Sequence, residues 1–367
     1  MNNNNEQIKR KFQTYLQDAQ GMAETTIDKY LRALELFEKA TNYKDYKRCT
    51  TQQIIGFKKT LRDRSTNGNP ISLVTIRSYL IYLQKFFKWL IDQPGYRTLK
   101  SQNIVEYLKP NRKENKIAAS SGRKDFPNLE YVQQLCSSIK IDDCYARRDR
   151  ALIAFTFMSG ARIDSIISLS ISCFNPETLR IDMDPKNGVK TKFSKYIPGK
   201  LFEFDKDLLK YVLDWYSYLL KIGFTPKDPL FPKTKMIATE DKYSFSKSDQ
   251  LSKEYWESTA GARNIFSARA KDANLKKYAP HNYRHGFILH VLPFVTSGDQ
   301  LKALSQTFGH ESVKTTLQHY GNFSDEERLK TLASIEFLAS STLSEHEKLF
   351  MEFTEFLRQK KENKDAR

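Results

Sequence analysis

Three short segments in the second half of the chain carry residues that together could cleave a phosphodiester bond. They are Ser159-Gly160-Ala161-Arg162, His281-Asn282-Tyr283-Arg284-His285, and Phe308-Gly309-His310 with Tyr320 ten residues beyond. Cleavage without a metal requires a nucleophile, a clamp on the non-bridging oxygens and an acid for the leaving 5′-oxygen. A planar guanidinium suits the clamp, because it grips phosphate oxygens bidentately and stays charged at any working pH. Arg162 and Arg284 are the candidates for this role.

Tyr320 is the candidate nucleophile of the set. Its phenolic oxygen would attack phosphorus and keep the bond energy in a 3′-phosphotyrosyl link. A free phenol has a pKa of about 10, so it needs a positive environment and a neighbouring base. His281 could be that base, and His310 could hydrogen-bond to a non-bridging oxygen.

In this order, the segments resemble those of the tyrosine recombinases, the phage-integrase family. That family carries an Arg in a T/S-G-x-R segment, a Lys in a β-hairpin, an H-x-x-R motif, a G-H motif and a Tyr nine or ten residues later. Transferred by position, the set is Arg162, a hairpin lysine, His281, Arg284, His310 and Tyr320. Two positions depart from the pattern. Ser165, preceded by Asp164, stands where the family often has an acid, and His319 occupies the nine-residue position.

A short β region between the first and second segments would supply the hairpin. TLRIDMD, VKTKFSK and LFEF read as strands, and the Pro-Gly pair within 197–200 suits the centre of a type II turn. This turn would place the closing strand at 201–204, directly before a helix capped by Asp205.

Three lysines of this region are candidates for the acid that protonates the leaving 5′-hydroxyl. The predicted turn leaves Lys195 at the mouth of the hairpin, so Lys195 is the expected acid, with Lys192 and Lys190 behind it. A closing strand that ended at Ile197-Pro198 would instead select Lys190, by counting back as in many relatives.

The charge of the chain favours a polyanionic partner. Sixty Lys and Arg residues against 43 Asp and Glu give a net charge of +17, with the excess concentrated in the first 125 residues. The first hundred residues show helical apolar spacing, with helix starts expected at Thr50 or Thr51 and at Ser72. The candidate DNA contacts are Arg77, Lys85 and Lys88 on the last of these helices, Arg112 and Lys113 in the following basic stretch, and Lys192.

The resemblance implies a mainly α fold with a small antiparallel β-sheet, arranged as a two-domain, C-shaped clamp around duplex DNA. The expected parts are a helical core-binding domain at 1–110, a basic linker at 111–125, a catalytic domain at 126–340 and a helical tail at 341–367. An apolar stripe on that tail would pack either on its own domain or on a neighbouring protomer.

The function that the resemblance implies is site-specific recombination of double-stranded DNA. Four identical protomers would act on two sites through a Holliday junction, with no ATP, metal or other cofactor. A type IB topoisomerase-like enzyme and a catalytically inactive DNA-binding protein of the same fold are the alternatives.

Other functional classes find little support in the sequence. No apolar run reaches the length of a membrane helix, and MNNNNEQIKRKF lacks the apolar core of a signal peptide, so we expect a cytoplasmic protein with no membrane partner. The four cysteines (Cys49, Cys136, Cys144, Cys173) have no paired spacing and predict reduced thiols rather than a disulfide framework or zinc site.

Overall fold

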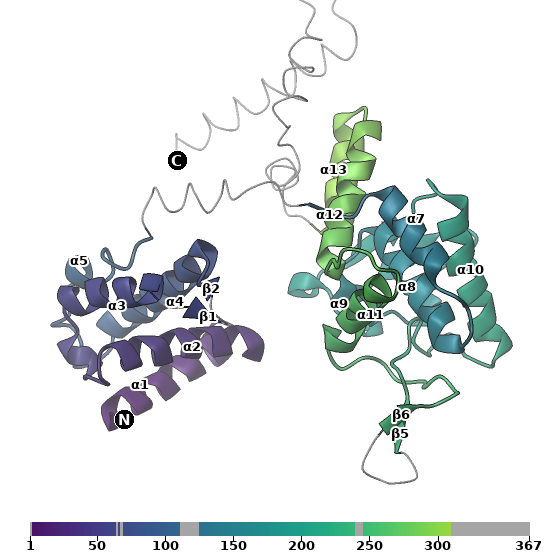
Figure 1. Cartoon of the computed structure of the whole chain (residues 1–367). Coiled ribbons are helices and arrows are strands. Elements are labelled where there is room, and N and C mark those ends of the chain that lie inside the picture. The colour runs from purple at the N-terminus through teal and green to yellow at the C-terminus, as the bar shows by residue number, and fades with distance from the viewer. Residues whose placement is uncertain (1, 64, 67–68, 111–124, 239–244, 310–367) are drawn as a thin grey trace, which may run out of the picture. The chain divides into compact units, whose positions relative to one another are not determined.

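The computed structural model describes residues 2–63, 65–66, 69–110, 125–238 and 245–309. The chain divides into two compact units, residues 1–124 and 125–367 (Figure 1). Both units are mostly helical with small antiparallel strand pairs, which confirms the predicted fold class. The C-shaped clamp and the finer domain limits stay predictions. His310, Tyr320, Arg112, Lys113 and the tail at 341–367 lie outside the described residues.

The N-terminal unit is a helical bundle around packed aromatic rings. Its elements are α1 (Asn3–Thr14), η1 (Tyr15–Ala19), α2 (Glu24–Ala40), η2 (Tyr46–Arg48), α3 (Thr51–Asp63), the pair β1 (Ser65–Thr66) and β2 (Asn69–Pro70), α4 (Leu73–Ile91) and α5 (Ser101–Ile104). The Ser72 hydroxyl accepts a hydrogen bond from the Thr75 N–H, so the predicted start of α4 is confirmed. Phe37 contacts Phe57 and Phe87 edge to face at the centre of the core.

The second unit is built around one buried helix. Its helical elements are α7 (Leu129–Ser138), α8 (Cys144–Ser159), α9 (Ile163–Ile166), η3 (Ile171–Cys173), η4 (Pro185–Asn187), η5 (Lys192–Ser194), α10 (Lys206–Lys221), α11 (Thr259–Asp272), α12 (Pro280–Val291), η6 (Leu292–Phe294) and α13 (Gly298–Thr307). Helix α8 contacts α7, α10, α11 and α12 (Figure 1). Its residues 151–159 are all buried. Burial on every side explains why this stretch is apolar without helical periodicity.

The strand pair β3–β4 corrects the predicted hairpin. β3 (Arg180–Met183) pairs antiparallel with β4 (Ile197–Lys200), with Met183 opposite Ile197. The segment predicted as a type II turn is therefore the closing strand, and 201–204 forms no strand. Gly199 lies opposite Ile181 in this pair, and a Cβ at Gly199 would approach the terminal methyl group of Met183 to 3.0 Å. The exposed Pro198 sits on a two-stranded sheet, where a missing N–H is tolerated.

Other expectations for this unit have mixed outcomes. Asp205 caps α10 by accepting a hydrogen bond from the Leu208 N–H, as predicted. A second strand pair of this unit, β5 (Met236–Ala238) with β6 (Phe245–Lys247), lies in a polar stretch for which the sequence predicted no strand. VKTKFSK was expected as a strand and forms the turn around η5. None of the four cysteines forms a disulfide, and no described helix is both long and apolar enough to cross a bilayer.

A buried ion network ties α8 to its neighbours. Arg148, whose side chain is 2% exposed, donates from Nε and Nη2 to Asp149 Oδ1 at 3.0 and 2.7 Å. Its Nη1 donates to the Pro232 carbonyl, while Asp149 Oδ2 accepts from Nε of Arg269 on α11 at 2.9 Å. One carboxylate is thus shared by two guanidinium groups and joins α8 to α11.

We predict that Asp149→Ala lowers the free energy of unfolding by about 3–5 kcal/mol, because it leaves the buried Arg148 charge without its counter-ion. Urea unfolding followed by circular dichroism would measure the loss. Glu35→Ala is the matched control, since Glu35 pairs with Arg32 and Lys39 on the surface of α2 and should change stability by less than about 1 kcal/mol. Equal losses of unfolding free energy in the two variants would contradict the role of Asp149 as the counter-ion of Arg148.

Candidate active site

The two predicted clamp arginines meet at one backbone oxygen. Arg284 on α12 is 2% exposed, and its Nη1 and Nη2 donate to the carbonyls of Gly160 and Phe308 at 2.8 and 2.7 Å. Arg162, half-buried just beyond α8, donates from Nη1 to the same Phe308 oxygen at 3.2 Å. Phe308 is the C-cap of α13, so its carbonyl has no partner within the helix. Three segments far apart in the sequence therefore converge through this oxygen.

Gly160 sets the direction in which the chain leaves α8. It closes the helix in the left-handed conformation, with φ +58°, and its N–H donates to the Thr156 carbonyl. A Cβ at this position would lie 2.4 Å from Phe287 Cδ1 on α12. Both the dihedral angle and the close approach require glycine. The Gly in the S-G-x-R segment therefore allows α8 and α12 to bring Arg162 and Arg284 together.

Gly309 plays the corresponding part at the end of α13. Its φ is +59°, and a Cβ there would lie 2.6 Å from Ile197 Cδ1 on β4 and 3.4 Å from Arg162 Nη1. The chain thus passes directly over the hairpin and the first arginine before it reaches His310. The predicted partners His310 and Tyr320 themselves lie outside the described residues.

His281 occupies the first turn of α12, three residues before Arg284 and hence on a neighbouring position of the helix surface. Its side chain is exposed, and its ring meets the ring of His285 edge to face, with 4.5 Å between centroids. His285 in turn stacks on Phe126 at 4.8 Å. The base candidate is therefore held on the same helix as the buried clamp arginine.

The corrected hairpin changes the argument for the lysine. The preference for Lys195 rested on a turn at 197–200, and that register is wrong because 197–200 is strand β4. The backbone of Lys190 is held at both of its polar groups: its N–H donates to Ser168 Oγ at 2.8 Å, and its carbonyl accepts from Ser165 Oγ at 2.7 Å. Both serines follow Arg162 closely in the chain. Ser165, the departure from the family pattern, thus attaches the hairpin segment to α9.

The remaining DNA-contact candidates differ in their surroundings. Arg77 and Lys88 are exposed on α4, and Lys192 is exposed in the hairpin turn. Lys85 is half-buried, donates to Gln20 Oε1 at 3.3 Å and lies 5.8 Å from the centre of the Tyr30 ring. Burial lowers the pKa of Lys85. Arg77 and Lys88 are therefore better placed than Lys85 to contact phosphates.

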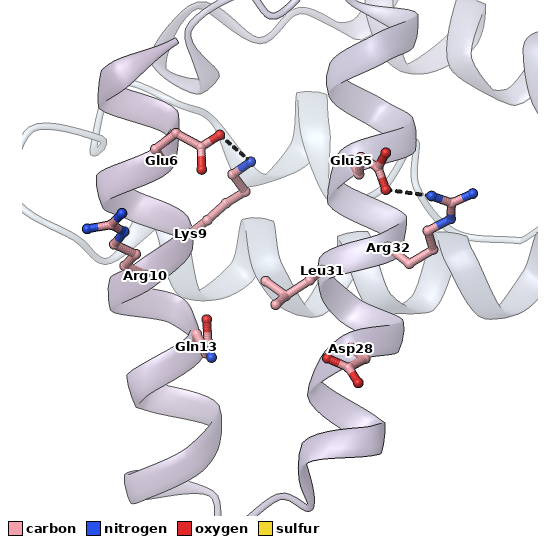
Figure 2. Close-up of a pocket in the computed structure, with 8 residues that line it drawn as sticks. All are labelled: Glu6, Lys9, Arg10, Gln13, Asp28, Leu31, Arg32 and Glu35. Carbon is pink, nitrogen blue, oxygen red and sulfur yellow. Dashed lines mark hydrogen bonds and ion pairs between the residues drawn. The ribbon is translucent and has the colours of Figure 1, made fainter. Parts of the chain in front are cut away.

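Two grooves of the N-terminal unit differ in their suitability for an anion. The groove between α1 and α2, about 460 Å³, is of mixed charge: Figure 2 shows Lys9 paired with Glu6 and Arg32 paired with Glu35. A second groove of about 490 Å³, at the start of α3 and α5, is lined by three cations and several hydroxyl groups. The cations are Lys47, Arg48 and Lys100, and no carboxylate is among the described lining residues. Sequence reasoning missed this group because its members come from separate segments.

Comparison with known proteins gives the following matches. Residues 127–327, more than half of the chain, match the phage integrase family, and residues 10–94 match the phage integrase N-terminal SAM-like domain. Tyrosine recombinase XerC of Natranaerobius thermophilus is 21% identical over 310 residues, which cover 83% of this chain and 90% of the relative. The ICEBs1 integrase of Bacillus subtilis is 22% identical, with 76% of this chain and 68% of the relative covered.

Solved structures of similar fold come from the same group of proteins. XerH site-specific recombinase bound to palindromic difH substrate has a TM-score of 0.61 at 18% identity, covering 89% of this chain and 84% of the other. A lambda integrase dimer bound to a COC′ core site has a TM-score of 0.60 at 14% identity, covering 91% and 99%. At such identities these structures show a shared fold.

We predict that Arg284→Lys destabilises the protein by about 1–3 kcal/mol although it conserves the charge. A single ammonium cannot span the carbonyls of Gly160 and Phe308, so one buried acceptor loses its partner. Thermal and urea unfolding would show the loss, and Arg77→Lys at an exposed position is the control. If Arg284→Lys were as stable as the wild type, the two hydrogen bonds of the Arg284 guanidinium would not be holding α12 and α13 together.

Proposed function

This chain belongs to the phage integrase family, the tyrosine recombinases, and on that premise we propose that it carries out site-specific recombination through a 3′-phosphotyrosyl intermediate at Tyr320. The supporting observation is the convergence of Arg162 and Arg284 on the Phe308 carbonyl, two residues before His310. A scissile phosphate placed beside this pair would meet two fixed guanidinium groups. The names of these relatives, a tyrosine recombinase and an integrase, support DNA recombination as the reaction, and we propose integration, excision or resolution as its outcome.

The chemistry assigned to the site is one transesterification and its reversal. Tyr320 attacks phosphorus, the P–O5′ bond breaks as the phenolic O–P bond forms, and His281 takes the phenolic proton. Arg162, Arg284 and His310 hold the non-bridging oxygens as the charge on them increases. The 5′-hydroxyl of another strand then attacks the phosphotyrosyl bond and restores the phenol. Four protomers exchanging strands in pairs on two DNA sites would pass through a Holliday junction, in the cytoplasm where the DNA lies.

We assign the acid for the leaving 5′-oxygen to Lys190 instead of Lys195. Lys190 is attached through its backbone to Ser165 and Ser168, directly beyond Arg162, and counting back from β4 leads to the same residue. Its ammonium group donates to the Glu257 carbonyl at 3.3 Å, a contact that must be exchanged for the 5′-oxygen. Lys192 and Lys195 lie farther along the turn and are assigned to phosphate contacts. Arg77 and Lys88, and Arg112 and Lys113 in the linker, would add further contacts to the DNA backbone.

We predict that Tyr320→Phe still binds DNA but forms no covalent adduct, because only the phenolic oxygen is removed. The probe is a duplex that the wild-type protein enriches from a random-sequence library, prepared with single nicks that trap a cleaved strand. Denaturing electrophoresis reports the adduct. His319→Ala should still be trapped, and a covalent band with Tyr320→Phe would show that the nucleophile lies elsewhere.

We predict that Lys190→Ala slows cleavage of an ordinary 5′-oxygen by about 10²–10⁴-fold, the usual contribution of a positioned acid. A 5′-bridging phosphorothiolate should restore the rate, because a thiolate leaves without a proton. Lys192→Ala and Lys195→Ala are the matched controls and should respond equally to both substrates. If the phosphorothiolate substrate restored the rate of Lys195→Ala and of no other variant, Lys195 would be the acid, as first expected.

A further inference from the structure

The segment that joins β3 to β4 contains a small turn at 191–195, which is closed by hydrogen bonds and held on both sides. The Thr191 hydroxyl donates to the Lys195 carbonyl at 2.6 Å, and the Ser194 N–H donates to the Thr191 carbonyl at 3.2 Å. On one side, Lys190 is held by the serine hydroxyls beyond Arg162. On the other side, the Tyr196 hydroxyl donates to Asp182 Oδ1 at 2.9 Å. Residues 191–195 are therefore a turn of defined geometry.

This turn exposes a large aromatic side chain to solvent, at a residue whose backbone has an unfavourable, left-handed conformation. Phe193 is 68% exposed, and it has φ +62°, followed by Ser194 with φ +49°. Neither residue is glycine, asparagine or aspartate, the types that adopt the left-handed region at least cost. Such strain persists only where surrounding interactions impose it, and it is concentrated at functional positions.

The intramolecular contacts of the Phe193 ring do not account for this arrangement. The ammonium groups of Lys192 and Lys195 lie 4.8 and 5.8 Å from its centroid. Cation–π contacts are weak where water reaches both partners. The result is an apolar ring flanked by two positive charges, which together match a nucleic acid: a base face for the ring and phosphates for the lysines.

Phe294 provides the comparison within the same unit. It is 71% exposed in η6, about as exposed as Phe193, but its φ is not in the left-handed region and no lysine lies over its ring among the described residues. Exposure alone thus does not distinguish Phe193. The distinguishing features are the closed turn, the backbone strain and the paired lysines.

We infer that Phe193 is a DNA-contacting wedge: its ring stacks on a base of the bound duplex, next to the phosphate held by the arginine pair, while Lys192 and Lys195 bind the flanking phosphates. This inference rests on the proposed function, because it takes DNA as the substrate of the site. Fixed at both ends, the turn would present the ring without a further loss of backbone freedom on binding. Phe193 would then open or kink the duplex at the point of cleavage.

The test uses the full-length protein and the duplex enriched from a random-sequence library, with 2-aminopurine replacing each adenine in turn. Unstacking of the probe raises its fluorescence. With the wild-type protein, the signal should rise several-fold at one or two adjacent positions. Phe193→Ala should abolish this rise and weaken binding about tenfold, the scale of one lost base–aromatic stack. Phe193→Trp should retain both, and Phe294→Ala should behave like the wild type.

Phe193→Gly distinguishes the effect of losing the ring from the effect of backbone strain, because glycine adopts the left-handed conformation without strain and carries no ring. It should behave like Phe193→Ala in fluorescence. An unchanged rise with Phe193→Ala, or no rise with the wild type, would overturn the wedge. Trapping of the Tyr320 adduct on nicked versions of the same duplex reports the proposed function independently, so a protein that forms the adduct but gives no Phe193-dependent signal would refute the wedge alone.

Discussion

The site depends on the carbonyl oxygen of Phe308. Two guanidinium groups repel one another, and they stay close only where acceptors hold both. This oxygen accepts from Arg162 and Arg284 together, and as the carbonyl of the C-cap residue of α13 it also lies at the negative end of a helix dipole. Gly160 and Gly309 are then explained as the positions where the chain must come close enough for that geometry. A concentrated positive charge is thereby built before any phosphate binds.

The sequence alone was enough to propose the side chains of this site. The arginines, histidines and tyrosine could be proposed because their chemistry resides in residue types at fixed spacing, and the capping residues Ser72 and Asp205 marked helix starts correctly. The shared acceptor could not be found in this way. A backbone carbonyl is present in every residue, and only the fold determines that the one of Phe308 faces both arginines.

The hairpin shows where local rules give the wrong answer. Pro198-Gly199 has the residue types of a turn, yet both residues lie in β4, where they pair with Asp182 and Ile181 of β3 and Pro198 is exposed. The pairing of Met183 with Ile197 sets the register, and the argument for Lys195 depended on that register. The strands β5 and β6 were missed for a related reason: they are short and lie in a polar stretch whose composition is that of a loop.

The path of the chain through Gly309 has a mechanical consequence. Because Phe308 shares its carbonyl between two arginines and its neighbour packs against β4, a displacement at the end of α13 is transmitted at once to the arginine pair and to the hairpin. The chain beyond this point carries His310 and Tyr320. The end of α13 and the arginine pair are therefore one mechanical unit, in which the acceptor of both guanidinium groups cannot shift without shifting them.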